Sequence, residues 1–215
     1  MSSLPTSDVH MSELSASSAQ PVKVIHPVWV RVVHWINALA MILMIMSGWQ
    51  IYNASPLFDF TFSRSITLGG WLAGALLWHF AAMWLLFASL TLYLAYGIAS
   101  GRFRKRLFPV TAGAVVHDLS AFVHGKLSHQ DLTVYNAVQR LAYLVAILAL
   151  IVVVLSGLSI WKPVQFQPLA ALFGGYEGAR IVHFVAMSTI VAFAAVHVVM
   201  ALSVPRSLLA MIRGR

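Results

Sequence analysis

Two histidines in one apolar stretch are the residues of this chain best suited to cofactor chemistry. His183 and His197 lie within residues 181–202, which read IVHFVAMSTIVAFAAVHVVMAL and contain no other ionisable side chain. Their spacing of 14 residues is nearly four helical turns at about 100° per residue, so both rings should leave a helix on almost one face, about 21 Å apart. A neutral imidazole is a common ligand for haem iron, and an ionisable group inside a membrane is costly enough to indicate a function.

The composition places these histidines in an integral membrane protein. The 215 residues are 60% hydrophobic and 9% charged, with a mean hydropathy of +0.84, which excludes an ordinary soluble domain. The net charge of +8 does not indicate a nucleic-acid partner, because the basic residues lie at the ends of apolar runs. The chain has no cysteine, so disulfides, iron–sulfur ligation and covalently attached haem are excluded, and His or Met must hold any haem.

Four apolar runs of helical length follow one another along the chain. Each exceeds the roughly 20 residues that cross about 30 Å of hydrocarbon. The predicted fold class is all-α, an integral membrane four-helix bundle with both termini on one side. The second run is too long for one crossing, so part of it should protrude. The runs cover residues 28–52, 66–99, 132–161 and 179–204.

The segments around these runs complete the predicted domain organisation. Residues 1–22 carry no signal-peptide pattern and are predicted to be a disordered cytoplasmic tail. Residues 23–206 are predicted to form the four-helix transmembrane domain, with a cytoplasmic loop at 101–131, and residues 207–215 a basic C-terminal tail. Within the loop, apolar residues alternate with polar ones over residues 107–130, as in an interfacial amphipathic helix.

The basic residues predict the orientation. Eleven of the 14 Lys and Arg residues lie on the side of the termini, and three lie on the other side: Arg64, Lys162 and Arg180. Because basic residues concentrate on the cytoplasmic side of a membrane, we expect a multi-pass protein of the bacterial inner membrane with both termini cytoplasmic. The loops at 53–65 and 162–178 should then face the periplasm.

His79 and His183 are predicted to form an outer pair. His79 lies 23 residues before Arg102, and His183 lies 23 residues before Arg206. At about 1.5 Å per residue, each is roughly 34 Å from the basic residue at the cytoplasmic end of its helix. Both should therefore lie at one depth, near the periplasmic side.

His34 and His197 are predicted to form an inner pair. His34 lies three residues after Arg31, and His197 lies nine residues before Arg206. A single membrane histidine can equally be a hydrogen-bonding bridge between helices, but four that sort by depth into two pairs favour ligation. The predicted cofactors are two b-type haems stacked in the bundle core, each with two axial imidazoles from facing helices.

Glycines and a short internal repeat accompany these histidines. Residues 46–48 (MSG) echo residues 155–157 (LSG), and residues 79–83 (HFAAM) echo residues 183–187 (HFVAM), which suggests two related hairpins. Glycines also remove side-chain bulk where two helices alone, or a flat macrocycle, could approach closely. They are Gly48, Gly69, Gly70, Gly74 and Gly157.

Three motifs carry a family resemblance. They are His26-Pro27 followed by Arg31 and His34-Trp35, the YNAVQ sequence at 135–139, and the His183 to His197 spacing that ends in HVVMA at 197–201. With them, residues 24–206 resemble the bacterial cytochrome b561-type membrane subunits. That family includes the di-haem gamma subunit of formate dehydrogenases and the b-type cytochrome of Ni/Fe hydrogenases.

The resemblance implies a cytochrome that passes electrons between a periplasmic metalloenzyme, of the molybdenum or Ni/Fe type, and a membrane quinone, menaquinone or ubiquinone. The family's haem ligands carry over in the same two pairs, onto His34, His79, His183 and His197. The family often has Gly between the Asn and Gln of the second motif, where this chain has Val138.

Asn136 and Gln139 are the candidate quinone contacts, with Tyr135 beside them. The two amides lie three residues apart at the cytoplasmic start of the third run, so they share a face at the depth of the inner pair. Their side chains could hydrogen-bond a quinone carbonyl. The alternative is a polar helix start that satisfies free backbone groups.

Three arginines are candidate contacts for the haem propionates, which need cationic or hydrogen-bonding partners. Arg31 and Arg206 could serve the inner haem, and Arg180 the outer one, although membrane topology alone would also explain all three.

Three function classes follow from the sequence. In the first, the chain is an electron-transfer subunit rather than an enzyme on its own, with lipid, quinone and a periplasmic enzyme as partners. In the second, it is an enzyme by itself and oxidises a small reductant such as superoxide at the outer haem. In the third, it is a membrane anchor whose histidines only bridge helices.

Overall fold

The computed structural model describes residues 27–101, 107–124 and 136–214. Within these residues the chain is helical with irregular connections, and four helices are long and apolar enough to cross a membrane. The predicted all-α class with four candidate spans is confirmed for this part of the chain. The spans are α1 (Val28–Ala54), α2 (Leu72–Ala99), α5 (Ala137–Trp161) and α7 (Gly175–Ser203).

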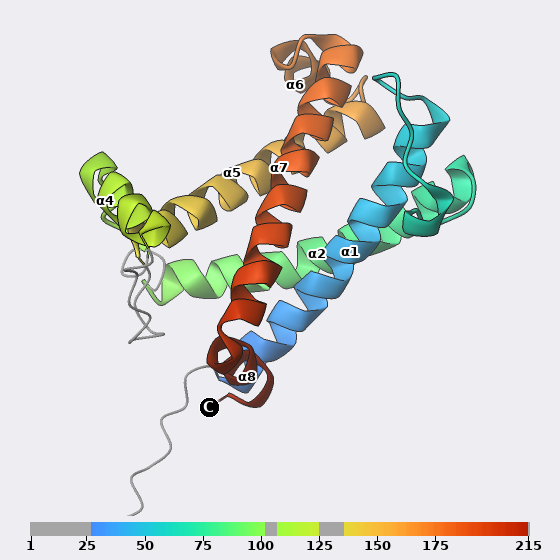
Figure 1. Ribbon diagram of the computed structural model, residues 1–215. Coiled ribbons are helices and arrows are strands. Elements are labelled where there is room, and N and C mark those ends of the chain that lie inside the picture. The colour runs from blue at the N-terminus through green and yellow to red at the C-terminus, as the bar shows by residue number, and fades with distance from the viewer. Residues whose placement is uncertain (1–26, 102–106, 125–135, 215) are drawn as a thin grey trace, which may run out of the picture.

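Shorter helices lie at the ends of the spans. Helix α6 and the loop after α1 lie at one end of the molecule, and α8 and the start of α1 lie at the other (Figure 1). Helix α4 lies beside the start of α5, inside the segment where the sequence predicts an amphipathic helix. These elements are η1 (Arg64–Ile66), α4 (Ala112–Val123), α6 (Gln167–Leu172) and α8 (Pro205–Arg213).

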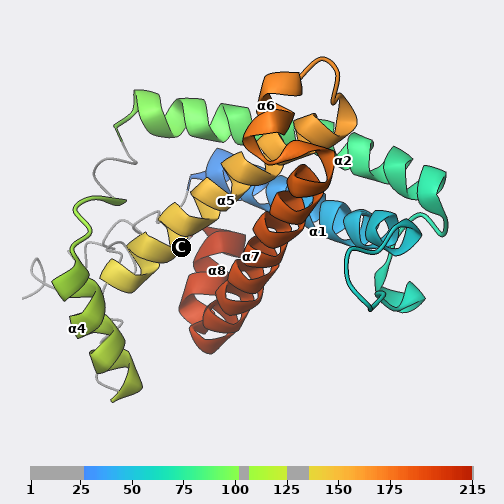
Figure 2. The same cartoon turned by 90° about the horizontal axis from the view of Figure 1, so that it is seen from above.

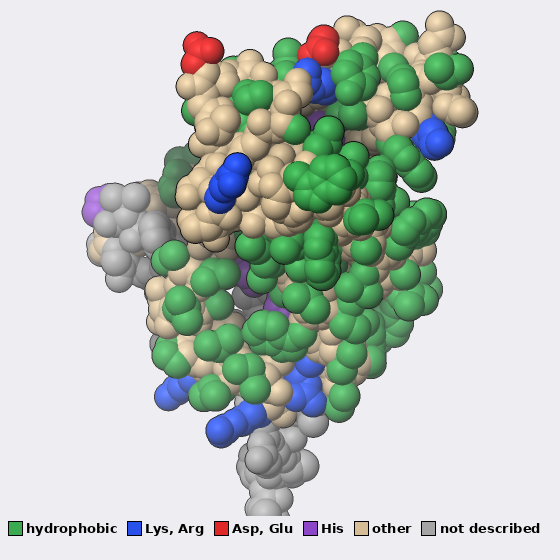
Figure 3. Space-filling view, turned by 90° about the vertical axis from the view of Figure 1, so that its right-hand side faces the viewer, with side chains coloured by type: hydrophobic (Ala, Val, Ile, Leu, Met, Phe, Trp, Pro, Cys, Tyr) green, Lys and Arg blue, Asp and Glu red, His purple; other side chains and the backbone are tan. Residues whose placement is uncertain are grey.

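The spans pack as two hairpins, α1 against α2 and α5 against α7 (Figure 2). Small side chains fill the contacts: Ala40, Ala75 and Ala179 are 0% exposed, and so are Ser47 and Ser156. Small residues let helix backbones approach closely, which is the usual packing of helices in lipid. Large apolar side chains point outward, and they cover the middle of the molecule, with Lys and Arg at its two ends (Figure 3).

Helix α2 begins at Leu72 rather than at residue 66 as predicted. Gly69 and Gly70 have φ values of +106° and +70°, a conformation that ends regular helix and favours glycine. A Cβ on Gly69 would lie 2.3 Å from the backbone nitrogen of Ala75. These two glycines therefore shape the turn that leads into α2, and Gly69 lies directly against the first turn of that helix.

The other predicted limits shift by smaller amounts. Helix α1 ends two residues beyond the predicted limit, α5 begins at Ala137, and α7 begins at Gly175, before the predicted start at 179. Residues 205–213, most of which were predicted as a basic tail, form α8. The predicted tail at 1–22 lies outside the described residues.

Candidate functional site: two histidine pairs

His183 lies on α7 and contacts α5. Its Nδ1 lies 2.9 Å from the carbonyl oxygen of Val153 and 3.2 Å from Oγ of Ser156. A carbonyl oxygen only accepts, so Nδ1 carries the proton and donates it. Nε2 is then the unprotonated nitrogen, which is the tautomer that a metal ligand requires.

His79 has the same arrangement in the first hairpin. Its Nδ1 lies 3.0 Å from Oγ of Ser47, and the Ser47 hydroxyl donates to the Leu43 carbonyl at 2.6 Å. The serine oxygen therefore accepts from Nδ1, and Nε2 is again unprotonated. A Cβ on Gly48 would lie 3.4 Å from Cε1 of His79, so the ring lies directly against the α1 backbone.

The structure brings the predicted outer pair together. His79 and His183 belong to different hairpins, and a positive charge on the His183 ring would be felt at His79. Aromatic rings close this end of the molecule, because Tyr52 and Phe184 join the two hairpins with ring centroids 5.1 Å apart. One histidine from each hairpin thus reaches a common region near the α6 end.

The inner pair is also brought together, nearer the α8 end. The ring centroids of His34 and His197 are 6.1 Å apart, with an angle of 56° between the rings. Two imidazoles that hold one metal through bonds of about 2 Å place their centroids about 6 Å apart. Phe193 stacks on His197 at 5.8 Å, and Trp35 meets His34 edge-on at 5.4 Å, so aromatic groups line this pair.

The donor set of both pairs fits haem. Among the described residues, no group of three or more His, Cys, Asp or Glu side chains could hold a bare metal ion. Two imidazoles suit an iron whose remaining ligands come from a porphyrin. Figure 3 shows histidine side chains recessed between the hydrophobic ones, where a flat apolar macrocycle would be shielded from water.

Arg31 offers a partner for a haem propionate. Its Nη1 donates to the Ile212 carbonyl at 2.6 Å. Its Nε is buried and has no hydrogen-bond partner among the described residues. A buried donor without an acceptor is costly, and a carboxylate is the strongest partner for a guanidinium, so this atom fits an anionic group beside the inner pair.

The other two propionate candidates have different surroundings. Arg180 donates to Glu177 at 2.8 Å and to the backbone and side-chain oxygens of Ser55, so it ties the start of α7 to the end of α1. Arg206 is exposed in the first turn of α8. These contacts of Arg180 and the exposure of Arg206 do not test a contact with a haem propionate, so both propionate contacts stay predictions.

The candidate quinone residues form a helix cap. Asn136 Oδ1 accepts from the Gln139 backbone at 2.7 Å, and Gln139 Oε1 accepts from the Asn136 backbone at 3.1 Å, which is a capping box. The alternative considered from the sequence is therefore what the structure contains. A quinone oxygen only accepts hydrogen bonds, so the amide N–H groups, which the cap leaves unused, are the ones that could serve a quinone. Tyr135 lies outside the described residues.

Asp118 of α4 completes this helix start. Its Oδ2 accepts from the Ala137 backbone N–H at 2.7 Å. That hydrogen bond, with a further one from His117, holds the pKa of the Asp118 carboxyl below its usual value. Arg140 donates to the Pro109 carbonyl at 3.1 Å, so α4 and the loop before it are joined to the first turn of α5.

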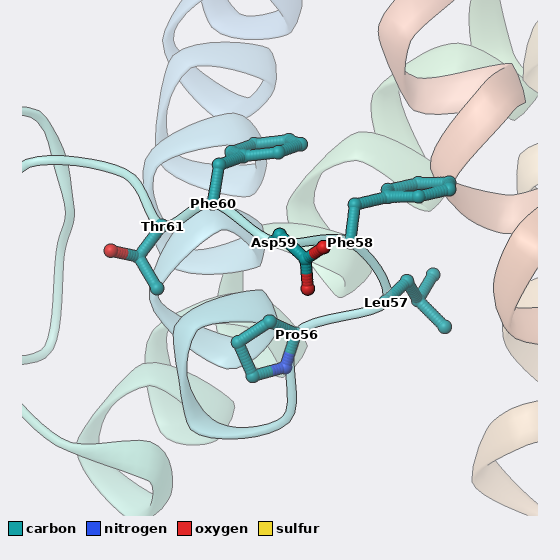
Figure 4. A pocket seen from close by; sticks show the side chains of 6 residues that line it. All are labelled: Pro56, Leu57, Phe58, Asp59, Phe60 and Thr61. Carbon is teal, nitrogen blue, oxygen red and sulfur yellow. The ribbon is translucent and has the colours of Figure 1, made fainter.

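A pocket in the loop after α1 is separate from the histidine pairs. Residues 56–61 line it (Figure 4), and no predicted site residue is among them. The functional residues that sequence reasoning missed are instead Ser47 and Ser156. Both stand in the internal repeat, directly before Gly48 and Gly157, and that repeat was the available signal.

Comparisons with known proteins agree with this geometry. The family profile described as prokaryotic cytochrome b561 matches residues 25–214. A protein of Azospira oryzae, whose name is given provisionally as protein-methionine-sulfoxide reductase subunit YedZ1, is 56% identical over 196 residues. The aligned part covers 91% of this chain and 99% of that protein.

Proposed function

This chain is a member of the prokaryotic cytochrome b561 family, and from that membership we propose that it is a di-haem cytochrome that carries electrons across the inner membrane. One observation supports the proposal most strongly: each of two histidine pairs joins one ligand from either hairpin, and the pairs lie toward opposite ends of the spans. That spacing suits two redox centres on a path across the bilayer.

Each pair has a stated role in the proposal. His34 and His197 hold the inner haem, with Arg31 beside its propionates, and His79 and His183 hold the outer haem. When bound, each haem supplies a one-electron carrier. The protein's own part is to orient the imidazoles, exclude water and keep both centres at a fixed separation.

The quinone site is proposed at the α8 end, near the inner pair. The excess of basic residues at that end supports a cytoplasmic location for it and for both termini. Asn136 and Gln139 would donate from their amide nitrogens to a quinone oxygen, with Tyr135 beside them. A quinol oxidised there releases two electrons to the protein and two protons to water.

The proposed acceptor is a periplasmic subunit that reduces methionine sulfoxide. The name of the Azospira oryzae relative and its 56% identity support this choice. The two electrons from quinol, with two protons, would convert the sulfoxide to a thioether and water. Electron flow would then run from the inner pair to the outer pair and on to the partner, as expected of a subunit.

Purification of the full chain from a bacterial membrane tests the proposal. We expect two haems per chain, a low-spin bis-imidazole spectrum, reduction by quinol, and co-purification with a methionine sulfoxide reductase. A chain without haem absorbance would support the anchor alternative. Turnover of superoxide without any partner would support the stand-alone enzyme.

A further inference from the structure

We infer that Ser47-Gly48 and Ser156-Gly157 are a matched pair of positioning elements for the two outer ligands. In each, the imidazole lies against the glycine of the neighbouring helix, and the serine fixes the ring's tautomer and rotation. The inference rests on the proposed function, because it takes His79 and His183 as haem ligands.

The two serines share one local geometry. Both are 0% exposed. The Ser47 hydroxyl contacts the carbonyls of Leu43 at 2.6 Å and Met44 at 3.2 Å. The Ser156 hydroxyl contacts those of Val152 at 2.7 Å and Val153 at 3.2 Å.

This geometry determines what the serine can do for the histidine. A hydroxyl has one proton, and here that proton is directed to the backbone carbonyl one turn earlier. Only a lone pair remains for the imidazole, so the serine can accept but not donate. It therefore selects the form of the ring with hydrogen on Nδ1 and leaves Nε2 for a metal.

The glycines set how closely each ring approaches. A Cβ on Gly157 would lie 3.2 Å from Cε1 and 3.5 Å from Nδ1 of His183. The corresponding contact of Gly48 with His79 is 3.4 Å. A methyl group at Gly157 would thus push its ring away, whereas one at Gly48 would meet ordinary van der Waals contact.

The two elements differ in one respect that makes them separable. Nδ1 of His183 has its closest acceptor in the Val153 carbonyl at 2.9 Å, with Ser156 at 3.2 Å. His79 also interacts with the corresponding carbonyl, that of Met44, but its hydrogen bond is with Ser47, at 3.0 Å. Loss of the serine should therefore matter more for His79 than for His183.

The hydrogen bond from Nδ1 should change the midpoint potential of the outer haem. A hydrogen bond donated from Nδ1 makes the imidazole a stronger donor to iron and stabilises the ferric state. Its removal should raise the midpoint potential of the outer haem and leave the inner haem unchanged. Ser159 is a matched control, because it is also 0% exposed on α5 and its hydroxyl contacts the Leu155 carbonyl at 3.0 Å.

The experiment is a redox titration of the full chain in membranes, followed by optical and electron paramagnetic resonance spectra. We expect a positive shift of the outer potential that is larger in Ser47→Ala than in Ser156→Ala and largest in the double variant, with Ser159→Ala unchanged. If Ser47→Ala and the double variant titrate like Ser159→Ala, the inference is wrong.

Glycine variants give a second measurement that does not depend on removing a hydroxyl. Gly157→Ala should alter the resonance spectrum of the outer haem more than Gly48→Ala. Gly113→Ala is the control, because a Cβ there meets nothing within 4 Å. Equal spectra for all three would also overturn the inference. A wild-type chain without haem would instead contradict the proposed function.

Discussion

One nitrogen atom on each histidine decides whether that residue can bind iron. The Val153 carbonyl accepts a hydrogen bond from Nδ1 of His183, and the Ser47 hydroxyl accepts one from Nδ1 of His79. Each ring thus keeps Nε2 unprotonated, and each proposed haem site needs two such nitrogens. Because the two pairs share no residue, they should fail independently.

Replacement of His183 tests that independence. His183→Ala should remove the outer haem and spare the inner one, so the haem absorbance per chain should fall by about half. Pyridine haemochrome assays on purified protein measure the loss, and His197→Ala should remove the other haem. Survival of both haems in His183→Ala would contradict the pairing.

The positive charge of Arg31 should affect the midpoint potential of the inner haem. Arg31→Gln should lower the midpoint potential of the inner haem, since loss of a cation beside a propionate favours the ferric state by on the order of 1 kcal/mol. Arg31→Lys should restore most of the value. Arg213→Gln, in the last turn of α8, is the control for net charge. An equal shift of the midpoint potential in that variant would contradict a specific contact between Arg31 and the propionate.

The histidine pairs could be predicted from the sequence, because helix rise alone places residues by depth. The roles of Ser47 and Ser156 could not, because a contact across two helices depends on how the hairpin is rotated. An apolar helix has no polar face, so the sequence does not show which of its side chains point toward the neighbouring helix. The repeat signalled the positions without saying what they touch.

At the scale of elements, the start of α5 is the junction with the clearest chemistry. The capping box of Asn136 and Gln139 satisfies backbone groups of the first turn, and the Asp118 carboxylate reaches the Ala137 N–H from α4. A negative charge at a helix N-terminus is also favoured by the helix dipole. A charged contact therefore helps to hold α4 against α5.

That contact should depend on pH. The pKa of Asp118 is lowered from 3.8 in the folded chain, first by the Ala137 N–H and next by His117. Its contribution to docking is thus present above about pH 3.8 and is lost as the pH falls through the lower folded value. Hydrogen exchange of residues 112–123 should rise over that interval.

Asp118→Asn should abolish this dependence and raise the exchange of α4 at neutral pH. Asp59→Asn, in the loop after α1, provides a control with the same change of charge. Exchange that is equally fast in both variants would show that the carboxylate does not hold α4.

Gln139 separates the helix cap from the proposed quinone role. Gln139→Ala should destabilise the first turn of α5 by about 1 kcal/mol through the loss of half the capping box. Gln139→Glu should keep the cap oxygen and remove the amide donor. If quinol reduces the inner haem equally well in wild type and Gln139→Glu, the residue is only a cap.

The spans were predictable as elements because apolar length is a strong signal. The start of α2 was misplaced because Gly69 and Gly70 are apolar by composition but adopt left-handed backbone conformations. Similarly, the capping residue Asn136 lies within an apolar run that begins earlier. Hydropathy does not report backbone dihedral angles.

For the whole molecule, the decisive feature is that close backbone packing lies within each hairpin. Between hairpins, the contacts come from side chains, such as His34 with His197 and Tyr52 with Phe184. A cofactor bound by both hairpins should therefore add much of the energy that joins them.

Haem loading should thus raise the apparent unfolding temperature of the full chain. Protein from haem-limited cells should melt at a lower temperature and be cleaved faster by protease than loaded protein. His34→Ala with His79→Ala, which takes both ligands from the first hairpin, should reproduce that behaviour even when haem is abundant. Identical melting in every case would show that the bundle does not need the cofactor.

Because each proposed haem would be bound by one histidine from each hairpin, the amount of this protein in the cell should depend on the supply of iron and porphyrin. In a cell short of iron or porphyrin, the chain would be inserted into the membrane but its two hairpins would not be joined by the cofactor. Quality-control proteases would then degrade it. The amount of this cytochrome would then follow the porphyrin supply without any dedicated transcriptional regulator.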